Sequence, residues 1–451
     1  MHRTLTCRSA LVLAATTGLA CAQWTQKAPT TSPTARVGAA MDFVPANLGA
    51  VLFGGSAGIA LSNQTWVYDG LDWTLQAPAT SPSGRFGAKL VYDAARARAV
   101  LYGGLATNIS VPPPNNDTWE WDGTNWTLMS PTTNAGNRYN YGMCYDTVRS
   151  RIVMYGGAST QLLTPPNNQT WEYQGTTWSL VTTTGNPGPR ERPAMCFHQG
   201  LGKAVMFGGG NGSGVLDQTW LYDGVAGTWT QLTIAGSKPS ARNAATMVYD
   251  ADRNLCVLTG GQDTTGVLSD TWTFDGTKWT QQPTTTQTVR DHASTYMPNT
   301  REVVKFGGFV AAPNTQSNQT WEIGGGIFGS GCVGTNGVPS LVAANAPLLG
   351  QPWSVGLTNL NPTFNIAILA FGFVQLPGID LSFLNMPGCA AFTFADITLT
   401  ITGSAGAANW TWPSVAGSLG DAFYGQAFCV DPAANLFGFT VSNPIWATIG
   451  F

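Results

Sequence analysis

The chain has 451 residues, of which 43% are hydrophobic and only 10% are charged, and it contains 54 glycines and 27 prolines. A chain so rich in turn-forming residues and so poor in charge is typical of a folded all-β protein rather than of a disordered one. Its 21 basic and 24 acidic side chains give a formal net charge of −3. This balance excludes nucleic-acid binding through a basic surface.

The first 22 residues have the features of a secretory signal peptide. Arg3 and Arg8 form a short basic region, Ser9 to Ala20 are small and apolar, and Ala20-Cys21-Ala22 offers a cleavage site before Gln23. Cys21 leaves a lipoprotein anchor as an alternative, although Gly18 stands where that motif requires a large aliphatic residue. No apolar run of about 20 residues follows, so we expect no transmembrane segment. The expected location is extracellular, at the cell surface or in the periplasm.

An internal repeat follows this segment. A Gly-Gly pair closes an apolar run six times, at intervals of 49, 53, 52, 52 and 47 residues: Gly54-Gly55, Gly103-Gly104, Gly156-Gly157, Gly208-Gly209, Gly260-Gly261 and Gly307-Gly308. An aromatic residue stands eleven positions before each pair, and a Thr-Trp dipeptide follows each pair, with its tryptophan at Trp66, Trp119, Trp171, Trp220, Trp272 or Trp321. Six copies of one pattern indicate six copies of one structural unit.

Each repeat is predicted to form four short strands. In the second repeat these are Phe86–Tyr92, Ala97–Tyr102, Asp117–Trp121 and Trp126–Met129, separated by turn residues such as Asp122-Gly123. Four strands in about 50 residues is the period of a β-propeller blade. The chain resembles kelch-repeat proteins, including the central domain of galactose oxidase and its secreted bacterial relatives, over Trp24 to about Ile323. The resemblance implies a six-bladed kelch propeller over residues 23–325, but it says almost nothing about function.

The two ends of the repeat region are expected to share one blade. The sixth repeat lacks a second tryptophan after Trp321, whereas Trp24-Thr25-Gln26 matches Trp229-Thr230-Gln231 and Trp279-Thr280-Gln281. The N-terminal strand is therefore predicted to complete the sixth blade and to cover an open sheet edge.

One face of the predicted propeller carries loops of varied length after each glycine pair, and we expect ligand binding there. Candidate ligand-binding residues on this face are Asn115, Trp121 and the arginines that begin each first strand: Arg36, Arg85, Arg138, Arg190, Arg242 and Arg290. The other interpretation of the arginines is structural, as a ring bonded to neighbouring carbonyls or acids. Most repeat tryptophans are expected in the core, and Trp121 is expected to be exposed.

No catalytic, metal or cofactor site can be identified in the sequence. After the predicted signal only two histidines remain, His198 and His292, and they stand at different positions of their repeats. No counterpart of a galactose oxidase copper site is found in the sequence. A carbohydrate-active enzyme stays open as an alternative, and it would need two carboxylates facing each other at the channel mouth, for example from Asp217, Asp263, Asp270 or Asp291.

The C-terminal part, residues 326–451, is predicted to be a small β-sandwich. Its alternating stretches include Trp353 to Leu357, Asp396 to Thr402 and Phe437 to Val441. The motifs around Cys332, Cys389 and Asp431 resemble a C-terminal module of secreted proteins from planctomycete-type bacteria. We predict a disulfide between Cys332 and Cys389 with Cys429 free, and Cys332 with Cys429 as the alternative pairing. Cys144, Cys196 and Cys256 are expected to be buried free thiols.

The favoured function is a secreted or surface-held, non-catalytic binding protein whose varied loops contact a protein or a glycan. The carbohydrate-active enzyme is the alternative.

Overall fold

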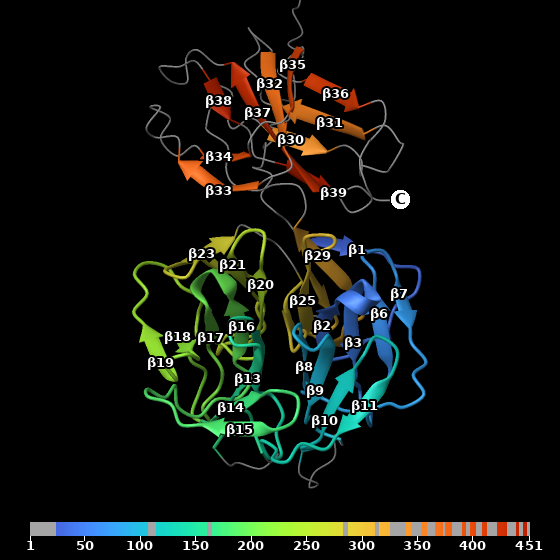
Figure 1. Ribbon diagram of the computed structural model, residues 1–451, viewed down its shortest axis with the longest axis vertical. Helices are drawn as coiled ribbons and strands as arrows, with labels where there is room; N and C mark the ends of the chain where they lie inside the picture. The colour runs from blue at the N-terminus through green and yellow to red at the C-terminus, as the bar shows by residue number, and fades with distance from the viewer. Residues whose placement is uncertain are drawn as a thin grey trace, which may run out of the picture.

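The computed structural model describes residues 24–106, 114–159, 165–282, 287–311 and 315–324, and ten strands between residues 340 and 448. The described part of residues 24–324 contains β-strands and two short 3-10 turns, η1 (Pro45–Asn47) and η2 (Gln199–Leu201), and no α-helix. This is an all-β architecture, as the composition predicts (Figure 1).

Six four-stranded antiparallel sheets account for most of this region, and we number them 1 to 6 in chain order. Their strands are, for sheet 1, β2 (Ala40–Val44), β3 (Gly49–Phe53), β6 (Thr65–Tyr68) and β7 (Trp73–Leu75); for sheet 2, β8 (Lys89–Asp93), β9 (Arg98–Tyr102), β10 (Thr118–Trp121) and β11 (Trp126–Met129); for sheet 3, β12 (Gly142–Asp146), β13 (Arg151–Tyr155), β14 (Thr170–Tyr173) and β15 (Trp178–Val181); for sheet 4, β16 (Ala194–His198), β17 (Lys203–Phe207), β18 (Thr219–Asp223) and β19 (Thr228–Leu232); for sheet 5, β20 (Thr246–Asp250), β21 (Leu255–Thr259), β22 (Thr271–Phe274) and β23 (Trp279–Gln282); and for sheet 6, β25 (Ala293–Met297), β26 (Glu302–Phe306), β29 (Thr320–Gly324) and β1 (Thr25–Lys27).

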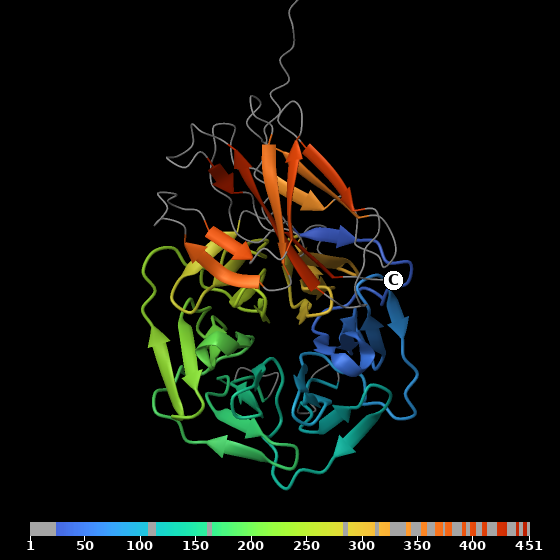
Figure 2. The same ribbon diagram turned by 45° about the horizontal axis from the view of Figure 1, so that its top comes forward.

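The first strands of the six sheets surround a common centre. Each contacts the first strand of the next sheet, in the cycle β2, β8, β12, β16, β20 and β25, and β25 returns to β2. Figure 2 shows the sheets arranged around this centre. The packing is that of a β-propeller, in which side chains between adjacent sheets form the core.

Sheet 6 combines strands from the two ends of the region. β1 pairs antiparallel with β29, with Thr25 opposite Glu322 and Lys27 opposite Thr320. The edge of β29 is therefore covered by β1, at the position that the Trp24-Thr25-Gln26 match predicts.

A repeated hydrogen bond joins each sheet to the one before it. The second tryptophan of every repeat donates from its indole Nε1 to the threonine that begins the third strand of the preceding sheet, at 2.8–3.0 Å. The six pairs are Trp73 to Thr320, Trp126 to Thr65, Trp178 to Thr118, Trp229 to Thr170, Trp279 to Thr219 and Trp24 to Thr271. Trp24 thus takes the part of the tryptophan that the sixth repeat lacks.

The glycine pairs allow the chain to pass close to the neighbouring sheet. Gly103 and Gly104 have φ angles of 55° and 94°, and the N–H of Gly104 donates to the carbonyl oxygen of Arg138 at 2.8 Å. A Cβ at Gly103 would lie 2.4 Å from that same oxygen. Glycine is required here by both the conformation and the close approach.

The first strands begin later than predicted. The prediction of a strand from Phe86 was wrong, because β8 begins at Lys89 and Gly87 has a left-handed φ of 70°. The other three strands of this repeat agree with the prediction to within one residue.

Ten strands are described in the C-terminal part, and their pairs are all antiparallel. One sheet contains β30 (Ser340–Ala343), β31 (Trp353–Thr358) and β36 (Ala408–Trp412); a second contains β32 (Ile366–Gly372), β35 (Ile397–Thr402), β37 (Ala422–Val430), β38 (Phe439–Val441) and β39 (Ile445–Thr448); and β33 (Gln375–Asp380) pairs with β34 (Ala390–Thr393). The predicted boundary at residue 326, the segment 1–22, Cys332 and Cys389 lie outside the described residues, and Cys429 lies in β37.

Candidate binding site at the centre of the loop face

The centre of the sheets is ringed by six residues in the left-handed conformation, which we call the collar. One comes from each repeat, with φ angles between 52° and 70°: Gly38, Gly87, Asn140, Arg192, Ala244 and Asp291. The first five stand two positions after an arginine, and Asp291 stands directly after Arg290. Each collar N–H donates to the carbonyl oxygen of the preceding collar residue at 2.5–3.1 Å, and the N–H of Gly38 closes the ring on Asp291. The backbone is thereby fixed around a central opening.

The loops that follow each glycine pair lie on the same side of the sheets as the collar, and we call this side the loop face. Isolated bridges join the residues just before five of the first strands to the loop that follows the second strand of the same sheet, as between Val37 and Ser56 or between Phe86 and Leu105. In the sixth repeat β24 (Val289–Arg290) pairs with β27 (Phe309–Val310), which pairs with β28 (Thr315–Gln316). The described parts of the varied loops therefore begin beside the central opening.

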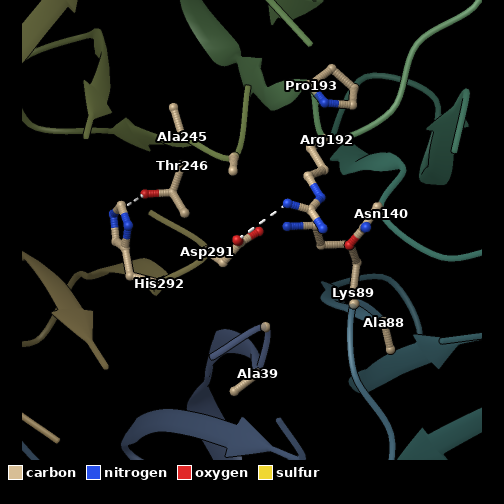
Figure 3. A pocket seen from close by; sticks show the side chains of 13 residues that line it. Ala39, Ala88, Lys89, Asn140, Arg192, Pro193, Ala245, Thr246, Asp291 and His292 are labelled. Carbon is tan, nitrogen blue, oxygen red and sulfur yellow. Dashed lines mark hydrogen bonds and ion pairs between the residues drawn. The ribbon is translucent and has the colours of Figure 1, made fainter. Parts of the chain in front are cut away.

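A polar pocket, here the mouth pocket, lies at the collar and is lined by residues from all six repeats. Figure 3 shows that the side chains of Lys89 and Arg192 both extend toward Asp291. Arg192 Nη1 lies 3.4 Å from Asp291 Oδ2, and Arg290 Nη1 lies 2.7 Å from the same oxygen. Burial lowers the pKa of Lys89, and the nearby Asp291 offsets part of that shift.

The mouth pocket holds more hydrogen-bond donors than acceptors. The buried Nδ2 of Asn140 and Nε of Arg192 have no hydrogen-bond partner. Two cations, Lys89 and Arg192, face the single carboxylate of Asp291, which Arg290 also contacts. Unpaired buried donors beside an excess of positive charge favour an anionic group as the ligand of this pocket.

A second pocket lies next to the mouth pocket along the first strands. Its lining includes four methionines at equivalent positions: Met41, Met143, Met195 and Met247. His292 borders both pockets, and its Nε2 lies 2.7 Å from Thr246 Oγ1 and 2.9 Å from Thr259 Oγ1. Burial, with the charges of Lys305 and Lys89, lowers the pKa of His292 well below its usual value, so this imidazole is neutral at pH 7.

Five of the predicted ligand-binding arginines are buried. Arg36, Arg85, Arg138, Arg190 and Arg242 are all 3% exposed or less. Each guanidinium donates to the carbonyl oxygen of the first glycine of its own repeat, at 2.8–3.1 Å, and to a Gln or Asp side chain before the first tryptophan. Burial lowers the pKa of Arg36, Arg138 and Arg190 to about 10, so these groups stay charged at pH 7. These bonds lie within one repeat rather than reaching a neighbouring sheet, and they favour the structural interpretation of the five arginines.

Arg290 is not the sixth member of this set. The second glycine of each pair donates to the carbonyl oxygen of the arginine in the next repeat, and Gly261 donates to Val289 at 2.9 Å. Val289 therefore occupies the arginine position of the sixth repeat, and Arg290 the position after it. Its spacing of seventeen residues, where the others have eighteen, is the sequence signal of this difference.

The prediction that Trp121 is exposed was wrong. Trp121 is 0% exposed, its ring centroid lies 5.3 Å from that of Trp126, and its Nε1 donates to Asn47 Oδ1 at 2.9 Å. Trp121 stands where other repeats have Tyr68, Tyr173, Tyr222 and Phe274, so it is a regular core aromatic.

Asn115 holds two parts of the backbone together. Its N–H donates to Gly104 at 2.8 Å and its carbonyl oxygen accepts from Arg138 at 3.3 Å, while its side-chain Nδ2 is buried without a partner. Asn115 is half-buried on the loop face, and its backbone hydrogen bonds help to join sheets 2 and 3.

Three of the carboxylates that a carbohydrate-active enzyme could use each interact with a different residue. Asp270 accepts from Arg242, Asp217 lies 2.7 Å from Lys238 Nζ, and Asp263 accepts from Thr265 in a turn. In the described part of the chain, no group of three or more His, Cys, Asp or Glu side chains is arranged to hold a metal ion. Among the same residues, no helix is long and apolar enough to cross a membrane.

Comparison with known families identifies the repeats. Residues 96–308 match the family model described as the KLHDC2/KLHL20/DRC7 Kelch-repeats domain. No curated protein matches the chain. The repeated four-stranded antiparallel sheets also fit a kelch β-propeller. Residues 96–308 are thus similar to a Kelch-repeats domain, and the repeated sheets fit the same kind of propeller.

Proposed function

We propose that the chain is a six-bladed kelch propeller, closed by its own N-terminal strand, that acts outside the cytoplasm as a non-catalytic binding protein. Kelch-repeat domains are generally protein-interaction modules, which supports a protein as the partner. The partner binds on the loop face and places an acidic side chain in the mouth pocket.

One observation carries this proposal. Lys89, Arg192 and Asn140 bring donors from three different repeats to one pocket, and Asp291 is the one carboxylate among its lining residues. A partner carboxylate would pair with the buried donors, and charge-assisted hydrogen bonds of this kind are among the strongest in proteins.

A glycan partner is less well supported by the described residues. Exposed aromatic side chains are typical of sugar-binding sites, whereas Trp121 and the second tryptophan of each repeat are 5% exposed or less and the first tryptophans are buried or half-buried. The large exposed apolar residues include Leu48, Leu71, Val148 and Val225 in turns on the side opposite to the loop face. That side is the competing surface for a protein partner.

The sequence alone supports the proposed extracellular or periplasmic location. Residues 1–22 have the pattern of a secretory signal, and the chain carries only six lysines.

Selection of peptides on the protein tests the proposal. A random displayed peptide library is selected in parallel on the wild-type protein, on the double variant K89A/R192A and on L71S/V225S. The equivalents of Lys89 include Ala40 and Ala194, and the collar already contains Ala244, so K89A/R192A is expected to fold normally. We expect Asp- and Glu-containing peptides to be enriched on wild type and L71S/V225S but not on K89A/R192A. Enrichment that survives K89A/R192A and is lost in L71S/V225S would contradict the proposal.

A further inference from the structure

Two cysteines from neighbouring sheets meet in the core. Cys196 lies on β16 of sheet 4 and Cys256 on β21 of sheet 5, and their Sγ atoms are 3.1 Å apart. Both side chains are buried, at 6% and 0% exposure, within one apolar cluster that joins the two sheets. The distance between the two sulfurs is shorter than an ordinary non-bonded contact between apolar atoms.

The same two positions recur at every boundary between sheets. The first stands twelve residues before the glycine pair of one repeat, and the second stands four residues before the pair of the next repeat. Core clusters bring several of these pairs together, including Val91 with Ile152, Cys144 with Ala204 and Val248 with Val303. The remaining boundaries have Asp42 with Ala99 and Thr295 with Ala50. Only the boundary between sheets 4 and 5 has a cysteine at both positions.

We propose that Cys196 and Cys256 are a disulfide-forming pair that links sheets 4 and 5 covalently when the chain meets a disulfide oxidant. A disulfide bond is about 2.05 Å long, so the two sulfurs have to approach by about 1 Å. This inference is independent of the partner and of the loop face.

The chemistry is a pair of thiol–disulfide exchanges with a small-molecule disulfide such as oxidised glutathione. The thiolate of one cysteine attacks the oxidant, forms a mixed disulfide and releases one small thiolate, which takes up a proton to become a thiol. The second cysteine, as its thiolate, then attacks the protein-bound sulfur and releases the second small thiol. Overall, two protein thiols lose two protons and two electrons, and the oxidant becomes two thiols.

Burial determines when this exchange can occur. The apolar surroundings and the nearby Cys256 raise the pKa of the Cys196 thiol, so the folded protein holds little of the reactive thiolate. The bond therefore forms while the boundary between the two sheets is still open, during folding, and is protected from reductants afterwards.

The test compares the full chain refolded with oxidised glutathione and with a reductant. Each sample is unfolded in a thiol-alkylating reagent and digested, and the cysteine peptides are identified by mass. After oxidising refolding we expect the peptides that contain Cys196 and Cys256 to be cross-linked, with neither residue alkylated. Alkylation of both residues after oxidising refolding, or linkage of Cys196 to Cys144, would overturn the proposal.

Matched variants separate this bond from the other cysteines. C196V/C256A introduces residues found at the same positions in other repeats, Val91 and Val248 for the first and Ala50, Ala99 and Ala204 for the second. C144V changes a buried cysteine at the position equivalent to Cys196. Closing a loop of about 60 residues should raise the melting temperature of oxidised wild type and C144V by about 5 °C over the reduced forms. A shift of the same size in C196V/C256A would contradict the assignment.

Discussion

Lys305 is the least expected side chain in the core. It is 2% exposed and its ammonium has no hydrogen-bond partner among the described residues, but it lies 4.3 Å from the ring of Trp24 and 5.6 Å from that of Trp321. Burial lowers its pKa to about 7. The same position in the other repeats is apolar: Leu52, Leu101, Met154, Met206 and Leu258. The contact with two indoles offsets only part of the cost of burying the charge.

Replacing Lys305 by methionine is expected to stabilise the protein and to change its pH dependence. Because the pKa of Lys305 falls from 10.5 to about 7 on folding, the unfolded chain binds the extra proton, and the wild-type free energy of unfolding rises between pH 7 and pH 10.5. K305M should remove this rise and be more stable by ~2–5 kcal/mol below pH 7. Urea unfolding of both proteins at several pH values measures the difference. Parallel curves for the two proteins would show that Lys305 is not the titrating group.

The structural arginines can be tested by a substitution that the chain itself contains. Val289 occupies their position in the sixth repeat, so valine fits there. R85V leaves the Asp117 carboxylate without the two bonds of 2.7 and 2.9 Å that it accepts from Arg85, whereas the side-chain partners of Arg36 are all neutral: Thr34, Ser62 and Gln64. We expect a loss of about 3 kcal/mol for R85V and about 1.5 kcal/mol for R36V, from unfolding in denaturant. Equal losses would mean that the charge of Asp117 contributes nothing.

At the residue level, the sequence predicted the repeated positions reliably, but it predicted the roles of the side chains at these positions less well. The spacing of Arg36 and its equivalents is visible in the sequence. The sequence does not distinguish a buried guanidinium that is bonded to a carbonyl oxygen from an exposed one that could bind a ligand. Trp121 was misjudged because tryptophan replaced tyrosine at a regular aromatic position. The collar was missed because its residues differ in type, and only their left-handed backbone unites Gly38, Arg192 and Asp291.

At the level of elements, β1 is the strand that joins the ends of the repeat region. It pairs with β29, and Lys27 Nζ lies 2.7 Å from Glu322 Oε2, while Trp24 donates to Thr271 of sheet 5. Its pairing could be predicted because three consecutive residues match the outer strands of other repeats. The later start of β8 could have been inferred from Gly87, but the left-handed collar residue is a glycine in only two of the six repeats, so the other four give no such signal.

Removing Gln23 to Pro33 is expected to abolish cooperative unfolding. The deletion takes away β1 and Trp24 together and exposes the edge of β29, which favours aggregation. The milder variant W24F keeps an aromatic ring and loses only the bond to Thr271, so it should cost about 1 kcal/mol and stay cooperative. Thermal unfolding followed by circular dichroism compares the two with wild type. An unchanged transition in the truncated protein would contradict the closing role of β1.

For the molecule as a whole, the low overall charge conceals one local excess. The formal net charge is only −3, yet Lys89 and Arg192 converge on the mouth pocket with a single facing carboxylate. The sequence could not reveal this, because the two cations are 103 residues apart and belong to different parts of their repeats. The fold brings them together at the centre of the loop face, where the varied loops begin.

The most direct test of the proposed binding face is a calorimetric titration of the most strongly enriched acidic peptide into three proteins. Wild type and L71S/V225S are expected to bind with the same affinity, and K89A/R192A at least tenfold more weakly, because a buried charge-assisted pair contributes about 1.5–3 kcal/mol. Affinity unchanged in K89A/R192A, with a loss in L71S/V225S, would place the binding site on the opposite side of the sheets and contradict the account.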